Sequence, residues 1–169
     1  EPSSSGVLFL GLNEIDNQVF VALIEETAEN GRRAIDLPDN LQRLGEDPQA
    51  WVIPRLFGTS NAVAAIAGDK VYWLDKTWHS RKLPKVPQFY KEFKPETFGG
   101  THYLDGSTLY AGWDHGEWGG MLASIDLSKE DSKWVHLSGK PVGDKSGIPQ
   151  NSPIQSIISP KRGDIWVAT

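Results

Sequence analysis

Hydrophobic and polar residues alternate over short stretches of this chain, and turn-forming residues interrupt the stretches. Four stretches share one pattern, in which a glycine-containing turn precedes an apolar run with an aromatic residue two or three positions in. They are GVLFLGL (6–12), GDKVYWLD (68–75), GSTLYAGWD (106–114) and GDIWVAT (163–169). Apolar residues flank each aromatic residue, so each stretch predicts a β-strand.

A second apolar run precedes three of these strands and predicts β-hairpins. The runs are AVAAIA (62–67), GGTHYL (99–104) and IQSIIS (154–159), each followed by a short polar turn. Further strands are predicted at 18–25, 32–38, 120–127 and 133–138. The run at 120–127, GMLASIDL, alternates only loosely, which indicates a strand that is covered on both faces.

The spacing of the repeated pattern predicts the architecture. Its aromatic residues Phe9, Tyr72, Tyr110 and Trp166 recur at intervals of 63, 38 and 56 residues. A four-stranded antiparallel unit repeated every ~40–50 residues is typical of a β-propeller blade. We therefore predict an all-β fold of antiparallel β-propeller blades, in a partial ring of three to four blades. Residues 1–169 would form one such domain or a fragment of it, with a polar lead at 1–5 and one short helix at 39–51.

The stretch IQSIISPKRGDIWVAT (154–169) resembles the repeat of two-component-regulator-type β-propellers. That repeat has an apolar–x–Ser–apolar run, a polar turn with Gly, and then apolar–Trp–apolar–Gly–Thr. Here Ala168 stands in place of the Gly, and Lys161 and Arg162 stand in place of the acidic turn residue. Ser159 to Trp166 also loosely resembles an Asp-box, with Lys161 at the Asp position.

The resemblance implies a function as well as a fold. In that family the propeller commonly serves as an extracytoplasmic ligand-sensing or ligand-binding domain, so a periplasmic or extracellular location is implied. The repeat residues build the blades and carry no catalytic role that can be transferred. The strands at 6–12 and 163–169 both correspond to the second strand of a blade, which leaves their edges open. We expect these edges to pair with each other, with a second copy of the chain, or with the missing part of a larger propeller.

Composition narrows the function classes. The chain contains no cysteine, which excludes disulfides, thiolate metal sites and cysteine nucleophiles. Its formal net charge is −5 with both signs interspersed, so we predict no nucleic-acid binding. The apolar runs are too short for membrane insertion. Glycine, proline and the seven tryptophans favour a turn-rich β-protein.

The stretch LYAGWDHGEWGG (109–120) is the strongest candidate site. Its glycines suit a tight turn, which needs no function. Alternatively, carboxylates and an imidazole project from a loop beside flat indole faces, an arrangement that suits carbohydrate. The stretch KTWHSRK (76–82) is either a solvated turn with a packed tryptophan or a second wall of that pocket. The predicted ligand-binding residues are Trp113, Asp114, His115, Glu117, Trp118, Trp78 and His79.

The same loop contains residue types that suit two other chemistries. Asp114, His115 and Glu117, with His102, have the right atom types for a divalent metal, but their spacing matches no known metal loop. Asp114 and Glu117 could form a glycosidase pair, but neighbours on one loop are poorly placed to fix the separation of two carboxylates. We predict no catalytic residue, no metal site and no cofactor. The predicted function is a non-catalytic ligand-binding or sensing module, with carbohydrate as the candidate ligand; the alternatives are a fragment of a carbohydrate-active enzyme (glycoside hydrolase or lyase) and a protein-interaction scaffold.

Overall fold

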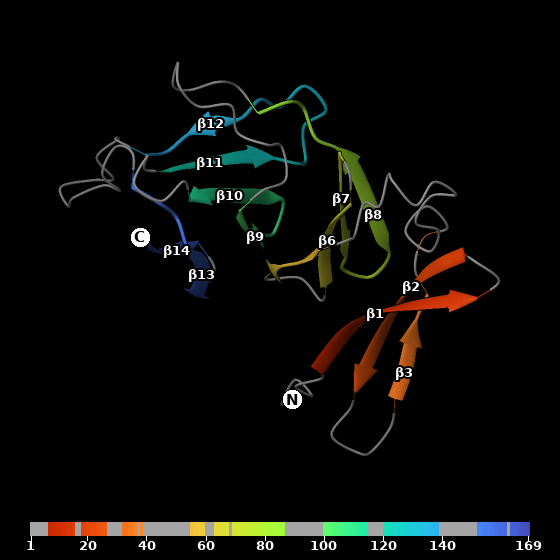
Figure 1. Ribbon diagram of the computed structural model, residues 1–169. Coiled ribbons are helices and arrows are strands. Elements are labelled where there is room, and N and C mark those ends of the chain that lie inside the picture. Colours follow the sequence, from red (N-terminus) through yellow and green to blue (C-terminus); the bar gives the residue numbers. More distant parts are fainter. Residues whose placement is uncertain are drawn as a thin grey trace. The chain divides into compact units, whose positions relative to one another are not determined.

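The structure is a computed structural model, shown in Figure 1, and its residues divide into two compact units, Glu1–Leu56 and Phe57–Thr169. It describes residues 7–15, 18–26, 32–36, 38, 55–59, 63–67, 69–86, 100–114, 120–138, 152–161 and 163–169. Every regular element in these residues is a β-strand, so the all-β prediction is confirmed for them. The helix predicted at 39–51 lies outside the described residues. Within the described ranges, no helix is long and apolar enough to cross a membrane.

The first unit contains an antiparallel sheet of three strands in the order β1-β2-β3. The strands are β1 (Val7–Ile15), β2 (Gln18–Glu26) and β3 (Arg32–Ile35), and a two-residue strand, β4 (Arg55–Leu56), follows later in the chain. β1 and β2 pair along their full length, from Val7 opposite Glu26 to Ile15 opposite Gln18. The strands predicted at 6–12, 18–25 and 32–38 are therefore present, and β1 has one strand neighbour among the described residues.

The described residues of the second unit form ten strands, five of which make up a central sheet. Strands β6, β7 and β8 form an antiparallel meander, and β13 and β14 form a separate hairpin. The central sheet has the order β12-β11-β10-β9-β5. All three predicted hairpins are present (Figure 1). The strands are β5 (Gly58–Thr59), β6 (Val63–Ala67), β7 (Lys70–Leu74), β8 (Trp78–Lys82), β9 (Thr101–Asp105), β10 (Thr108–Asp114), β11 (Gly120–Asp126), β12 (Val135–His136), β13 (Ser156–Lys161) and β14 (Asp164–Ala168).

One pairing departs from the predicted antiparallel pattern. β5 lies parallel to β9, with Gly58 opposite Tyr103 and Thr59 opposite Leu104. A β-carbon at Gly58 would lie 2.7 Å from Cδ2 of the Tyr103 ring, so glycine allows this close approach. The described sheets do not close into a ring.

Apolar side chains cover the central sheet on both faces. On one face Leu104, Leu109 and Ile125 pack in a cluster that includes residues of β6 and β7, such as Ile66 and Val71. On the opposite face a second cluster joins Tyr103, Leu122, Ile154 and Ile157, with Ile165 and Val167 of β14 packed against it. Strand β11 alternates between the two clusters, as the loose pattern of GMLASIDL predicted.

The hairpin β13–β14 is attached to the central sheet at two points. The Ile154 N–H donates to the Trp113 carbonyl at 3.0 Å, just before β13 begins. At the hairpin turn, the Gly163 N–H donates to Oδ2 of Asp105 at 2.9 Å. Gly163 has a φ of 88°, a conformation that favours glycine. The positive φ therefore favours glycine at this turn, and its backbone N–H joins the turn to Asp105.

Candidate functional site

The predicted loop site begins at the end of β10, and its first tryptophan belongs to the core. Trp113 is 2 % exposed, and its ring meets Trp134 edge-on with centroids 6.2 Å apart. It lies on the same face of β10 as Leu109 and Ala111, which fill the cluster shared with β6 and β7. The next residue, Asp114, is exposed and ends the strand. His115, Glu117 and Trp118 lie outside the described residues.

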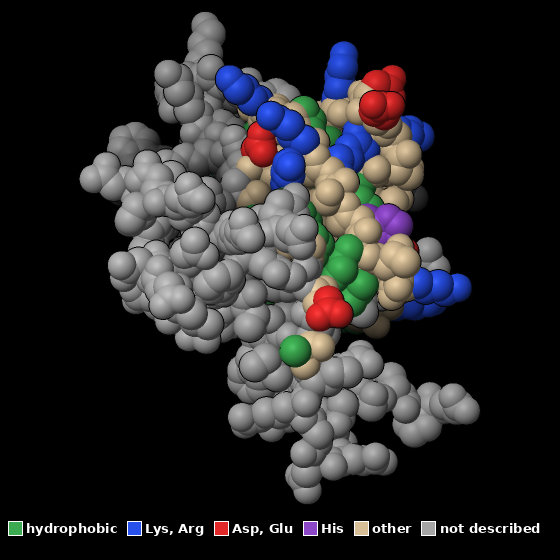
Figure 2. Space-filling model, turned by 90° about the vertical axis from the view of Figure 1, so that its right-hand side faces the viewer, with side chains coloured by type: hydrophobic (Ala, Val, Ile, Leu, Met, Phe, Trp, Pro, Cys, Tyr) green, Lys and Arg blue, Asp and Glu red, His purple; other side chains and the backbone are tan. Residues whose placement is uncertain are grey.

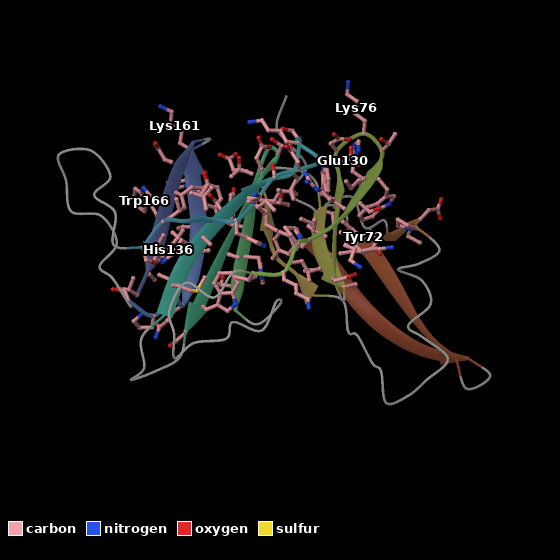
Figure 3. All side chains as sticks on the ribbon, turned by 90° about the horizontal axis from the view of Figure 1, so that it is seen from above. Tyr72, Lys76, Glu130, His136, Lys161 and Trp166 are labelled. Carbon is pink, nitrogen blue, oxygen red and sulfur yellow. The ribbon has the colours of Figure 1, made fainter. Side chains whose placement is uncertain are left out.

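The turn between β7 and β8 carries a second cluster of polar and aromatic side chains, which Lys76 marks in Figure 3. Asp75 organises this turn with one carboxylate oxygen. Oδ1 accepts hydrogen bonds from the N–H of Thr77 at 3.1 Å and from the N–H of Lys76. An aspartate that bonds the backbone after it is a common way to hold a tight turn.

These bonds stabilise the ionised carboxylate of Asp75. The N–H of Thr77 is the largest cause, followed by the N–H of Lys76, and the His79 ring adds to them; together they lower the pKa of Asp75 from 3.8 to about 2. The Asp75 side chain is 52 % exposed, so it stays available to solvent and to a ligand. It is therefore a fixed, negatively charged acceptor at neutral pH.

His79 joins this carboxylate to an aromatic ring. Its Nε2 lies 3.1 Å from Oδ1 of Asp75, and its ring stacks on Trp73 with centroids 5.3 Å apart and 18° between the planes. Trp73 and His79 are opposite each other in the β7–β8 register, which places their side chains on one face. Trp73 also packs against the buried cluster, so the core supports the stack.

The geometry suits binding better than nucleophilic catalysis. Thr77 Oγ1 lies 3.5 Å from Nε2 of His79, the same nitrogen that contacts Asp75. A hydroxyl–imidazole–carboxylate relay needs the hydroxyl and the carboxylate on different ring nitrogens. What this turn offers is an exposed carboxylate beside a stacked aromatic pair. Both can contact a polar ligand that has apolar C–H faces.

Sequence reasoning identified Trp78 and His79 but not Trp73 and Asp75. The signal was present in the hairpin itself, because Trp73 and His79 are equidistant from Lys76, as are Asp75 and Thr77. Residues equidistant from the centre of a tight turn become cross-strand neighbours. Trp78 begins β8 and pairs with Leu74, and it is partly buried.

Arg81 ties β8 to the turn that follows β11. Its Nη1 donates to the Asp126 carbonyl at 3.2 Å, and its Nη2 donates to the Glu130 carbonyl at 2.6 Å. The guanidinium therefore holds the strand that carries His79 against the central sheet. On the face shown in Figure 2, described basic and acidic side chains lie near one another, so no patch of one sign dominates it.

The remaining candidate, His102, is 7 % exposed in the interior of β9. Its ring centroid lies 5.6 Å from that of Phe57. Its strand alternates between the two faces of the central sheet, since Leu104 points into the first cluster and Tyr103 into the second. Within the described ranges, no group of three or more His, Asp or Glu side chains could hold a metal ion.

The predicted site therefore divides between two sheets, with Asp114 at the end of β10 and His79 at the start of β8. Of the predicted residues that the structure describes, His79 lies in a turn cluster with Trp73 and Asp75, which the sequence had not indicated. Comparisons of the chain with models of protein families, with curated proteins and with solved structures find no match.

Proposed function

We propose that this protein is a non-catalytic ligand-binding module built from β-propeller-type blades, and that its ligand is a carbohydrate. The observation that carries the proposal is the stacked Trp73–His79 pair beside the ionised carboxylate of Asp75. Aromatic rings pack against the C–H faces of sugars, and carboxylates accept hydrogen bonds from sugar hydroxyls.

The arrangement of sheets in the second unit supports the propeller part of the proposal. Three antiparallel units follow one another in chain order: β6–β8, β9–β12 and β13–β14. The middle unit packs against the unit before it through one face and against the unit after it through the other. Consecutive antiparallel sheets that pack face to face are the building principle of propellers. The resemblance at 154–169 adds an extracytoplasmic role, in the periplasm or outside the cell.

Glycan-array binding followed by calorimetry with the best glycan tests the proposal. Asp75→Asn and His79→Ala change exposed side chains, so the fold should survive. We expect each to weaken binding about tenfold or more, because each removes one side of the contact. Asp126→Asn is the matched control. Asp126 is also an ionised turn aspartate with a pKa of about 2, but Ser128 and Lys129 surround it in place of aromatic rings.

Three results would contradict the proposal. The first is the absence of any glycan ligand. The second is a ligand whose affinity falls equally in Asp126→Asn, which would place binding elsewhere. The third is hydrolysis or elimination of a bound glycan, which would favour a carbohydrate-active enzyme.

A further inference from the structure

The hairpin β13–β14 covers only part of the central sheet. A row of side chains crosses this face in register, from Tyr103 of β9 through Tyr110 and Ser124 to Val135 of β12. Tyr103 is 8 % exposed, Tyr110 and Ser124 are partly buried, and Val135 is 49 % exposed. Exposure rises along the row because Ile157 of β13 packs over the β9 end, while no described strand covers the β12 end.

Apolar side chains lie at the end of the face that no described strand covers. Leu137 follows β12 and donates its N–H to the Leu122 carbonyl at 2.9 Å, which places it beside Leu122. It is a partly buried member of the second cluster, together with Tyr110. Burial raises the pKa of the Tyr110 hydroxyl, with a smaller contribution from Asp105, which agrees with its partly buried position. Leu137 and Val135 form an apolar floor that ends in solvent.

The edge of β14 provides the wall beside this floor. β14 lies on the β12 side of β13 in Figure 1, and β13 is its one strand neighbour among the described residues. The Gln155 N–H donates to the Ala168 carbonyl at 2.9 Å, so the backbone of Ala168 faces β13. Backbone groups alternate in direction along a strand, and those of Val167 and Ile165 therefore face the open edge. We call this edge and the floor of Val135 and Leu137 the β14 step.

The two other sheets of the second unit show what fits such a step. Each has a hairpin whose second strand, β7 or β10, pairs on its far edge with a third antiparallel strand, β8 or β11. The aromatic residues Tyr72, Tyr110 and Trp166 mark β7, β10 and β14 as equivalent strands. β14 is the one of the three that has no third strand among the described residues.

We propose that the β14 step binds an extended peptide segment in trans, as an antiparallel strand added to β14. The backbone groups of Ile165 and Val167 would bond the segment, and its alternate apolar side chains would cover Val135 and Leu137. This is recognition by β-strand addition, in which the sheet edge gives affinity and the floor gives specificity. The proposal rests on sheet packing and is independent of the carbohydrate proposal.

A second copy of the chain is a poorer occupant. Antiparallel pairing of β14 with its own copy needs a two-fold axis perpendicular to the sheet, and this axis places both central sheets on the same side of the joined sheet. In each copy β11 and β12 already lie against the face of β14 that turns toward the central sheet, since Leu122 and Leu137 belong to the cluster that Val167 contacts. The two central sheets would therefore compete for one space, whereas a single peptide strand brings no second sheet.

The test uses the whole chain and a synthetic peptide with the β11 sequence GMLASIDL, with lysines added at both ends for solubility. This probe is chosen because β11 occupies the equivalent place beside β10. We expect saturable binding and slower hydrogen exchange at the amides of Ile165 and Val167. The same peptide with N-methylated backbone amides should not bind, because it cannot pair with the edge.

Two matched variants locate the binding. Val135→Lys changes a residue that is 49 % exposed on the floor, and Ile158→Lys changes one that is 51 % exposed on β13 but outside the second cluster. We expect Val135→Lys to weaken peptide binding about tenfold and Ile158→Lys to change it by less than about twofold. Absence of binding, equal loss in both variants, or concentration-dependent dimerisation that protects Ile165 and Val167 without peptide would each overturn the proposal.

Discussion

A single methyl group added at Gly112 should test how tightly β13–β14 packs on the central sheet. A β-carbon there would lie 2.7 Å from Cβ of Ile154, closer still to Cγ2 of Ile154, and 3.1 Å from Cγ2 of Thr101. Ile154 is 1 % exposed, and its N–H is bonded to the Trp113 carbonyl, so it has little freedom to move away. Overpacking of this kind costs about 1–3 kcal/mol. We expect Gly112→Ala to lower the free energy of unfolding by that amount.

A second substitution separates this clash from a general intolerance of the strand. Ile154→Ala alone should lower the free energy of unfolding by about 2–5 kcal/mol, because it leaves a cavity in the second cluster. In the double variant the alanine methyl at 112 enters part of the space that Ile154 vacates. The combined loss should therefore be smaller than the sum of the single losses, by about 0.5–3 kcal/mol.

Urea unfolding of the four proteins, followed by tryptophan fluorescence, measures the effect. Two results would refute the packing argument. One is a Gly112→Ala variant as stable as the original protein. The other is additivity of the two substitutions to within about 0.5 kcal/mol, which is the behaviour of residues that do not touch.

Two further substitutions test contacts around the central sheet. The pKa of Asp126 is lowered from 3.8 to about 2, first by a hydrogen bond from the Ser128 hydroxyl, then by one from the Ser128 N–H, with a contribution from Lys129. Because the folded pKa lies below the unfolded value, these bonds stabilise the folded protein fully above about pH 4. This stabilisation is lost as the pH falls through about 2. NMR titration should find that midpoint and its rise in Ser128→Ala, and a midpoint near 3.8 in the original protein would contradict the assignment. Trp134→Phe removes the hydrogen bond from Nε1 to the Pro84 carbonyl, which is 2.9 Å long. Because a partly buried acceptor is left unpaired, the free energy of unfolding, measured in urea, should fall by about 1–3 kcal/mol. A loss below about 0.5 kcal/mol would show that water replaces the bond.

The hairpins could be predicted because their signals are local. Alternating apolar residues around Gly106 and Gly163 define the strands on either side of each turn, and both glycines adopt positive φ. The layering could not be predicted in the same way. The contact of Ile157 with Tyr103 joins residues of separate hairpins, and the parallel pairing of β5 involves only Gly58 and Thr59, too short a segment for a periodic signal.

The candidate site was predictable in part. His79 and Trp78 were identified from the stretch KTWHSRK, whereas the stack on Trp73 depends on the exact register of the β7–β8 hairpin. For Trp113 the sequence carried two competing signals. The polar loop that follows it suggested a ring that faces a ligand, whereas its spacing from Leu109 and Ala111 is that of one strand face, and the ring packs with these two residues in the core.

The two covers of the central sheet also imply an order of events during synthesis. The cluster around Leu104, Leu109 and Ile125 draws on strands that leave the ribosome before β9, so it can close once Trp134 has emerged. The cluster on the other face has to wait for Ile154, Ile157 and β14. Until then Tyr103 and Leu122 present an apolar surface on an otherwise finished sheet, which is the kind of intermediate that chaperones recognise. The face that carries the β14 step is therefore the one whose residues are synthesised last.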